Sequence, residues 1–225
     1  LLIEESVAFS WILNEYGILI IGAGIALLLN TYMPSVEKDI RAAQKEVEEL
    51  FRAILLSFSR SILTQKKDAE EEVLLQKLDA TLKRGMDKAQ RLASNYLSES
   101  FVYYVRYMEM RIKQYEVLKI MSDHLNHVTR YYEQNRLVAS LSELVSDQFQ
   151  EINTAKELMD DLCDYLEIFR GQDLPKTREE FENRSSLYQY IRDLQRLLEI
   201  KKKFSESLSD YDKQTFWKQK KDGAA

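Results

Sequence analysis

The sequence has few of the residues that interrupt helices or cross-link a chain. Its 225 residues include 2 prolines, 6 glycines and 1 cysteine, Cys163. A single cysteine excludes an internal disulfide framework and suits a reducing compartment, so we interpret it as a small helix-packing residue. Between residues 35 and 222 the only helix breakers are Gly85, Gly171 and Pro175. Long helices are therefore expected over most of the chain.

The sequence also lacks an excess of basic residues. Its net charge is −5, and Glu4, Glu5 and Glu15 supply −3 of that before the first basic residue, Lys38. The remaining −2 leaves no basic field of the kind that nucleic-acid binding needs. We expect no nucleic-acid partner.

No recognisable catalytic motif is present. The sequence has no Gly-rich phosphate loop, and Gly22-Ala23-Gly24 follows no strand, as a dinucleotide fingerprint would require. His124 and His127 are one helical turn apart, but a structural zinc site usually takes four ligands. We interpret both histidines as polar surface residues. The sequence predicts no enzyme activity, no cofactor and no metal.

The most informative feature that is present is an uncharged apolar run at residues 16–33, with Asn30 as its single amide. As a helix these residues would extend roughly 27 Å, close to the ~30 Å hydrocarbon core of a bilayer. The run therefore predicts a transmembrane helix. A signal peptide and a buried soluble helix are the alternatives. Acidic residues before the run and the lack of a small-residue cleavage pattern disfavour the signal peptide.

Charges and aromatic residues around the run predict its orientation. Lys38, Arg41 and Lys45 follow it, whereas only acidic charges precede it, and positive charge is retained on the cytoplasmic side. Rings that suit the headgroup zone flank the run at Trp11, Tyr16 and Tyr32. The expected location is the cell membrane, with residues 35–225 on the cytoplasmic side.

Gly22 and Ala26 form a small-xxx-small pair inside the run. Such pairs let membrane helices approach closely, so both residues are candidates for membrane helix packing. The expected partners are the lipid bilayer and other membrane helices, either of the same protein or of identical subunits in a homo-oligomer.

The rest of the chain predicts an all-α fold, with the transmembrane helix followed by an antiparallel bundle of about five long helices. Pro34 and Ser35 would begin the first helix, and Gly171 in a left-handed conformation would end the fourth. Thr177 and Glu180 form a capping box that would begin the fifth. The predicted helices cover residues 36–64, 68–97, 101–132, 135–169 and 177–205. The expected domains are 1–34 as the transmembrane helix and its flank, 35–205 as the bundle, and 206–225 as a C-terminal tail.

The third predicted helix carries two apolar seams on nearly opposite faces. A helix that is apolar on two sides belongs in the middle of a bundle, and short loops favour antiparallel neighbours. One seam contains Phe101, Val105, Met108, Ile112 and Tyr115, and the other Tyr103, Tyr107, Met110, Val117 and Met121.

Tyr103, Arg106, Tyr107 and Arg111 are the candidate ligand or interaction residues. Arginine can pair with a carboxylate through two bonds, and tyrosine rings can stack on an aromatic acid. The alternative, which we favour, is that the rings belong to the core and the arginines pair with acidic side chains such as Glu109 or with residues on neighbouring helices.

Three segments of the sequence resemble a known family. The segments are GAGIALLLNTYMPS at residues 22–35, YVRYMEMR at 104–111, and LPKTREEFENR at 174–184, which continues through Leu187 and Asp193 to Lys201 and Phe204. Together they resemble the putative aromatic acid exporter family of bacteria, over about residues 17–204. The first segment resembles the end of the family's membrane part, and the other two resemble its cytoplasmic C-terminal domain.

The resemblance implies that this chain is the cytoplasmic helical domain, with the last membrane span, of an exporter-like protein. The domain would act in assembly, interaction or gating of transport. The alternative is a single-span membrane-anchored scaffold or signalling adaptor without transport activity. The sequence begins with Leu1 rather than methionine, so we expect further chain upstream, where additional spans would favour the exporter. We interpret residues 174–184 as an architectural segment and not as a binding loop.

Overall fold

The computed structural model describes residues 2–95, 99–150 and 152–218, but not the side chains of 2–10, 12, 13, 29–37, 95, 99, 100 and 218. All regular structure in these ranges is helical, which confirms the all-α prediction. The helices are α1 (Leu2–Thr64), α2 (Glu71–Asn95), α3 (Glu99–Leu125), α4 (Glu133–Asp147), α5 (Lys156–Arg170), α6 (Arg178–Glu206) and α7 (Asp210–Asp212), followed by the π-helix η1 (Lys213–Lys218).

The chain divides into two compact units, Leu1–Ala42 and Ala43–Ala225. The first unit is the N-terminal part of α1. In the described part of the chain no helix combines the length and the apolar character needed to cross a membrane, so the predicted span at residues 16–33 is not confirmed. The side chains of its last five residues, 29–33, lie outside those that the structure describes.

The predicted helix start at Pro34 and Ser35 is wrong, because the α1 backbone stays helical from Leu2 to Thr64. A proline inside a helix removes one backbone hydrogen bond and its ring crowds the preceding turn, but the turns on either side keep α1 continuous. The helix ends instead at Thr64, where Gln65 adopts a left-handed φ of 53°.

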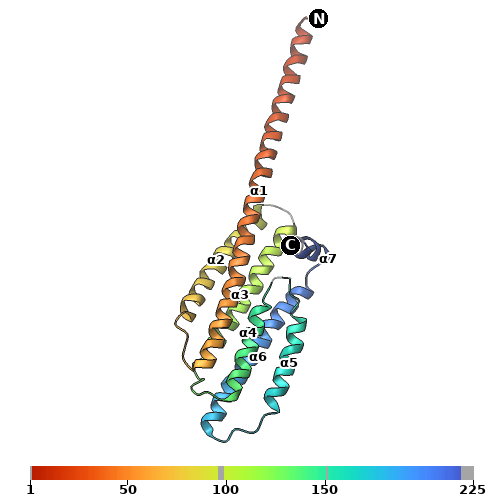
Figure 1. The fold of residues 1–225 in the computed structure, drawn as a ribbon. Helices are drawn as coiled ribbons and strands as arrows, with labels where there is room; N and C mark the ends of the chain where they lie inside the picture. Colours follow the sequence, from red (N-terminus) through yellow and green to blue (C-terminus); the bar gives the residue numbers. More distant parts are fainter. Residues whose placement is uncertain (1, 96–98, 151, 219–225) are drawn as a thin grey trace. The chain divides into compact units, whose positions relative to one another are not determined.

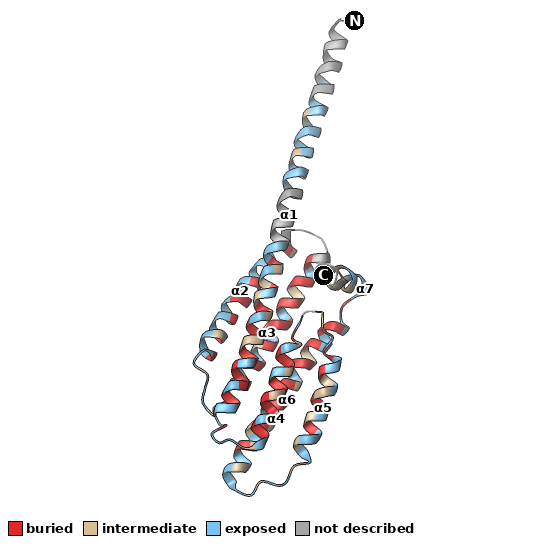
Figure 2. Cartoon of the chain, viewed as in Figure 1, coloured by how far each residue is buried: buried red, intermediate tan, exposed pale blue. Residues whose placement is uncertain are grey.

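The second unit is a bundle made by residues 43–64 of α1 together with α2 to α6. Successive helices run in alternating directions, so each is antiparallel to the one before it (Figure 1). The inner faces carry the buried residues (Figure 2). Met108 from one predicted seam is fully buried, and Met110 from the other is 4% exposed. The second seam is buried throughout, whereas Val105, Ile112 and Tyr115 of the first seam are half-buried, so α3 has apolar contacts on two sides as predicted.

Helix α2 packs against α3 at Gly85. A Cβ atom built there would lie 2.8 Å from Cε of Met108, which is too short for a normal contact. The glycine lies inside α2 and does not end it. Its missing side chain leaves room for the end of the Met108 side chain.

The single helix predicted at residues 135–169 is wrong, because α4 and α5 are separated by residues 148–155. The Asn153 side chain accepts a hydrogen bond from the Ala155 amide at 2.6 Å, and Ala155 has a left-handed φ of 61°. An asparagine side chain that mimics a turn can interrupt a helix without glycine or proline. The third helix also ends earlier than predicted, at Leu125 rather than residue 132.

The connection between α5 and α6 follows the predicted caps only in part. Gly171 caps α5 with a right-handed φ of −75°, so the predicted left-handed conformation is wrong. Thr177 is the N-cap of α6, and its hydroxyl accepts a hydrogen bond from the Glu180 amide at 3.1 Å, as predicted. The Glu180 carboxylate accepts from the Lys176 amide at 2.9 Å, one residue before the donor that a capping box would use.

Replacing Thr177 by alanine should remove the cap of α6. We expect the free energy of unfolding to fall by about 1 kcal/mol, because N-cap losses typically have this size. The measurement is the denaturant midpoint. Thr177→Ser is the matched control, since serine keeps the acceptor oxygen. Equal midpoints for the alanine variant and the wild type would contradict the capping argument.

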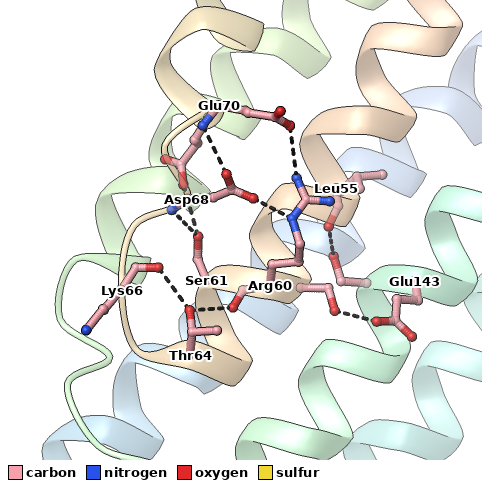
Figure 3. Close-up of polar contacts among 11 residues, drawn as sticks. Leu55, Arg60, Ser61, Thr64, Lys66, Asp68, Glu70 and Glu143 are labelled. Carbon is pink, nitrogen blue, oxygen red and sulfur yellow. Dashed lines mark hydrogen bonds and ion pairs between the residues drawn. The ribbon is translucent and has the colours of Figure 1, made fainter.

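The α1–α2 connection is held by a cluster of side-chain hydrogen bonds around Arg60 (Figure 3). The Arg60 side chain donates to Asp68 at 2.5 Å, and the Glu70 amide donates to the other Asp68 oxygen at 3.0 Å. The Asp68 amide in turn donates to the Ser61 hydroxyl at 3.0 Å. The amide hydrogen bond from Glu70, followed by Arg60, lowers the pKa of Asp68.

The lowered pKa gives Asp68 a pH-dependent role. A carboxylate whose pKa is lower in the folded state stabilises the fold above its unfolded pKa of about 4, and this contribution disappears as pH falls through the folded value. Asp68→Asn should therefore destabilise at pH 7 and match the wild type in strong acid. Thermal melts over this pH range test it, with Glu167→Gln, at an exposed residue of α5, as the control. A stability difference independent of pH would contradict the assignment.

Candidate functional site

The four candidate residues of α3 do not form an open site together. Tyr103, Tyr107 and Arg111 are at most 1% exposed, whereas Arg106 lies at the surface of the same helix. The buried three belong to the core, as the favoured interpretation expected. A ligand could reach them only by displacing core side chains.

The Arg111 guanidinium is enclosed by aromatic rings. Its central carbon lies 4.5 Å from the ring centroid of Phe149, 5.0 Å from Tyr107 and 5.4 Å from Phe51. The Phe51 and Phe149 rings stack on each other with centroids 5.0 Å apart. Ring faces attract a cation, and this attraction is strongest where water is excluded.

Each nitrogen of the Arg111 guanidinium has a partner within the protein. Its Nε donates to the Tyr107 hydroxyl at 3.0 Å, one terminal nitrogen donates to Gln114 at 3.0 Å, and the other lies 3.4 Å from Glu48. Gln114 then donates to the Leu197 carbonyl of α6 at 2.8 Å. This arrangement ties α1, α3 and α6 together, and it makes Arg111 a structural residue of the core.

The C-terminal segment covers the Tyr103 end of α3. The ring of Phe216 stacks on Tyr103 with centroids 4.0 Å apart, and the Trp217 indole donates to the Tyr103 hydroxyl at 3.3 Å. Lys201 is only 4% exposed, with its Nζ 5.8 Å from the Trp217 ring. Phe216 and Trp217 therefore pack on the bundle, and Lys201 is buried, whereas Lys202 and Lys203 are exposed.

Arg106 binds the end of α6, a neighbouring helix, through Ser207 and not through an acidic side chain such as Glu109. One of its terminal nitrogens donates to both the carbonyl and the hydroxyl of Ser207, at 2.8 Å each. A cation at a helix C-terminus also interacts favourably with the helix dipole.

Beside this contact lies a groove of about 400 Å³, which we call the α3–α6 groove. It is lined by Arg106, Glu109, Met110, Lys113, Ile200, Lys203, Phe204 and Ser207. Its volume falls within the range of about 300–1,000 Å³ that is typical of small-molecule sites. It combines an apolar floor of Met110, Ile200 and Phe204 with charged groups at its edges.

A second hollow of about 320 Å³ lies at the α5–α6 connection, lined in part by Leu174, Phe181 and Tyr188. Leu174 is 85% exposed, so the segment 174–184 presents an apolar side chain to solvent at its first residue. Arg184 donates to the Asp173 carbonyl at 2.5 Å and to Glu180 at 2.6 Å. These contacts support the architectural role predicted for residues 174–184.

The two histidines and the small-residue pair Gly22 and Ala26 were the other residues considered as sites. His124 lies 3.2 Å from Asp193, and burial raises the pKa of that carboxyl group. Within the described ranges no three metal-ligating side chains converge.

A Cβ atom added to Gly22 would meet nothing within 4 Å, and Ala26 is exposed, so the packing role of both stays a prediction.

The comparison with known families identifies the chain. Residues 37–202 match the family model described as "Putative aromatic acid exporter C-terminal domain". The chain belongs to this family. The match confirms the resemblance carried by residues 104–111 and 174–184.

The uncharacterized protein YqjA of Bacillus subtilis (strain 168) is a relative of this exporter-family domain. The two are 28% identical over 196 residues, which is 87% of this chain and 60% of YqjA. The chain thus spans somewhat under two thirds of the relative that it matches.

A crystal structure described as a "putative membrane protein from Clostridium difficile 630" has the same fold. It covers 74% of this chain and 99% of its own, with a TM-score of 0.66 and 20% identity. At that identity the likeness concerns the fold alone.

Two residues of the Arg111 environment were missed by the sequence interpretation, Glu48 and Phe149. They lie 63 and 38 positions from Arg111, so helical spacing could not have linked them to it. The only local signal was the polar cluster around Phe149, which is typical of a break between helices.

Proposed function

We propose that this chain is the membrane-anchored, cytoplasmic helical domain of an exporter-like protein, and that it acts in assembly, interaction or gating and not in catalysis. Membership of the aromatic acid exporter family supports this role. The structural neighbour from Clostridium difficile is likewise described as a putative membrane protein. The proposed partners are the bilayer and other membrane helices of the same protein or of identical subunits.

The observation that best supports a membrane anchor is the exposure of apolar side chains in the first unit, residues 1–42. Consecutive residues of α1 are more than half exposed: Ile18 (63%), Leu19 (66%), Ile20 (68%) and Ile21 (65%). Four consecutive positions point to every side of a helix, because each residue turns it by about 100°. Large exposed apolar surfaces mark contact with a membrane or another protein. We propose that this surface contacts lipid.

Membrane association can be tested by fractionating cells that express the chain. The wild type should stay in the membrane after alkaline carbonate washing. Ile20→Arg with Ile21→Arg should release it, because each charge at a helix centre costs about 2.5–3.5 kcal/mol of insertion free energy. Phe181→Arg, at an exposed residue of α6, is the control. Wild-type protein that is fully soluble without detergent would refute the anchor.

The orientation needs a separate experiment. Alkaline phosphatase fused after Phe204 should be inactive, and a fluorescent protein fused there should fold, if the bundle is cytoplasmic. An active phosphatase at this position would place the bundle on the other side and would contradict the orientation that the charge asymmetry predicts.

A further inference from the structure

We infer that the C-terminal residues 208–218, which we call the strap, are exchangeable, and that a second copy of this chain docks by placing its own strap in the same socket. The socket consists of Tyr103 and Tyr104 of α3 with Lys201 and Phe204 of α6. The inference goes beyond the proposed membrane role and does not depend on it, because it concerns the bundle alone.

The socket combines aromatic rings with one buried cation. The ring centroid of Tyr103 lies 5.6 Å from that of Tyr104 and 6.0 Å from that of Phe204. Lys201 is 4% exposed, and its Nζ atom lies 5.6 Å from the centroid of the Phe204 ring. Such a group of side chains holds an aromatic residue through ring stacking and through cation–π attraction. The socket therefore suits a segment that carries aromatic side chains.

The strap shows which chemistry the socket accepts. The Phe216 ring is stacked on Tyr103 at 4.0 Å with an interplanar angle of 4°, and it lies edge-on to Tyr104 at 5.3 Å. The Trp217 indole donates to the Tyr103 hydroxyl at 3.3 Å, and its ring lies 5.8 Å from Nζ of Lys201. Every copy of the chain carries the same two adjacent aromatic residues. The strap of a second copy therefore fits the socket as well as the chain's own strap does.

The strap has its own internal hydrogen bonds, and a short link joins it to the bundle. The Ser209 amide donates to the Asp212 side chain at 3.2 Å, and the Asp212 amide donates to the Ser209 hydroxyl at 3.1 Å. Only residues 207–209 lie between α6 and α7. A rotation of the backbone before Ser209 would move the strap away without breaking these bonds. Short hinges of this kind favour the exchange of a segment between identical chains.

The end of α6 stays fixed to its own bundle on the other side of the hinge. Arg106 of α3 donates to both the carbonyl and the hydroxyl of Ser207 at 2.8 Å each. The conformational change is thereby confined to the few residues that follow Ser207. Two copies that each give and receive a strap form two identical contacts, so association closes at a dimer.

Mixing two variants of the full chain in mild detergent tests the inference. Both carry Trp11→Phe, which leaves Trp217 as the single tryptophan. The strap variant also carries Phe216→Ala and Trp217→Ala, so it has an intact socket and no tryptophan. The socket variant carries Tyr103→Ala instead and keeps its strap. On mixing, the Trp217 emission should shift to shorter wavelength and saturate, because the strap of one chain enters the socket of the other.

A strap variant that also carries Tyr103→Ala is the matched control, because it offers no intact socket and should cause no shift. Light scattering should find two chains in the mixed complex. Unchanged Trp217 emission on mixing the first two variants would mean that each strap serves only its own bundle and would overturn the inference.

A synthetic peptide of residues 208–218 gives a second test, which does not require the Tyr103→Ala chain to fold. The strap variant should bind this peptide saturably. The wild type should bind it at least about tenfold more weakly, since its own strap occupies the socket. The peptide with Phe216→Ala should bind neither protein. Circular dichroism verifies that the strap variant folds, and no saturable binding to it at millimolar peptide would refute the socket.

Discussion

Replacing Arg111 by alanine is expected to lower the free energy of unfolding by about 3–5 kcal/mol, the usual cost of removing one partner from a buried ion pair. The loss combines an unpaired Glu48 carboxylate, which is 13% exposed, with a void beside the stacked Phe51 and Phe149 rings. Chemical denaturation monitored by circular dichroism gives the value.

Charge and volume can be separated by further variants. Arg111→Met fills part of the void without the charge, and adding Glu48→Gln should then recover part of the lost stability, because the remaining carboxylate no longer lacks a partner. Arg178→Ala is the surface control, since the Arg178 side chain is 92% exposed in its pair with Glu182. A loss below about 1 kcal/mol for Arg111→Ala would mean that the buried pair contributes no more than a surface pair.

The second large effect is expected from charges placed on either side of α3. Met108→Asp and Met110→Asp should each reduce stability by about 3 kcal/mol or more, because an unpaired charge would be buried at each position. Thermal melting of the two variants and the wild type measures the effect.

Controls on the same helix show whether burial is the cause. Val102→Asp, at a position that is 48% exposed, should melt near the wild-type temperature. Met108→Leu and Met110→Leu keep the volume and should cost less than about 1.5 kcal/mol. If either aspartate variant melted like the wild type, that face of α3 would lie outside the core and its central position would be wrong.

The features of the fold that could be predicted depend on neighbours in the sequence. The two seams of α3 and the N-cap at Thr177 each involve residues within a few helical turns of one another. Over such short distances, helical geometry determines which residues share a face or form a hydrogen bond. The break before α5 was missed because Ala155 adopts a left-handed conformation without being glycine. Its cause, the side chain of Asn153, is a weaker signal in sequence than a glycine or a proline.

The candidate site was harder to predict because its contacts join distant parts of the chain. Arg106 meets Ser207 across 101 positions, and Gln114 meets the Leu197 carbonyl across 83. The sequence showed that arginines and tyrosines alternate on α3, but not which of them the other helices would cover. The structure separates a buried Arg111 from a surface Arg106, and only the second lines the α3–α6 groove.

The continuity of α1 decides how this protein can be shortened for experiments. Residues 43–64 supply Glu48 and Phe51 to the surroundings of Arg111, although they belong to the same helix as the apolar N-terminal segment. A shortened protein that began at α2 would lose them and leave Arg111 buried without its carboxylate. The smallest independently folding fragment should therefore start at or before Ala43, inside a helix and not at a loop.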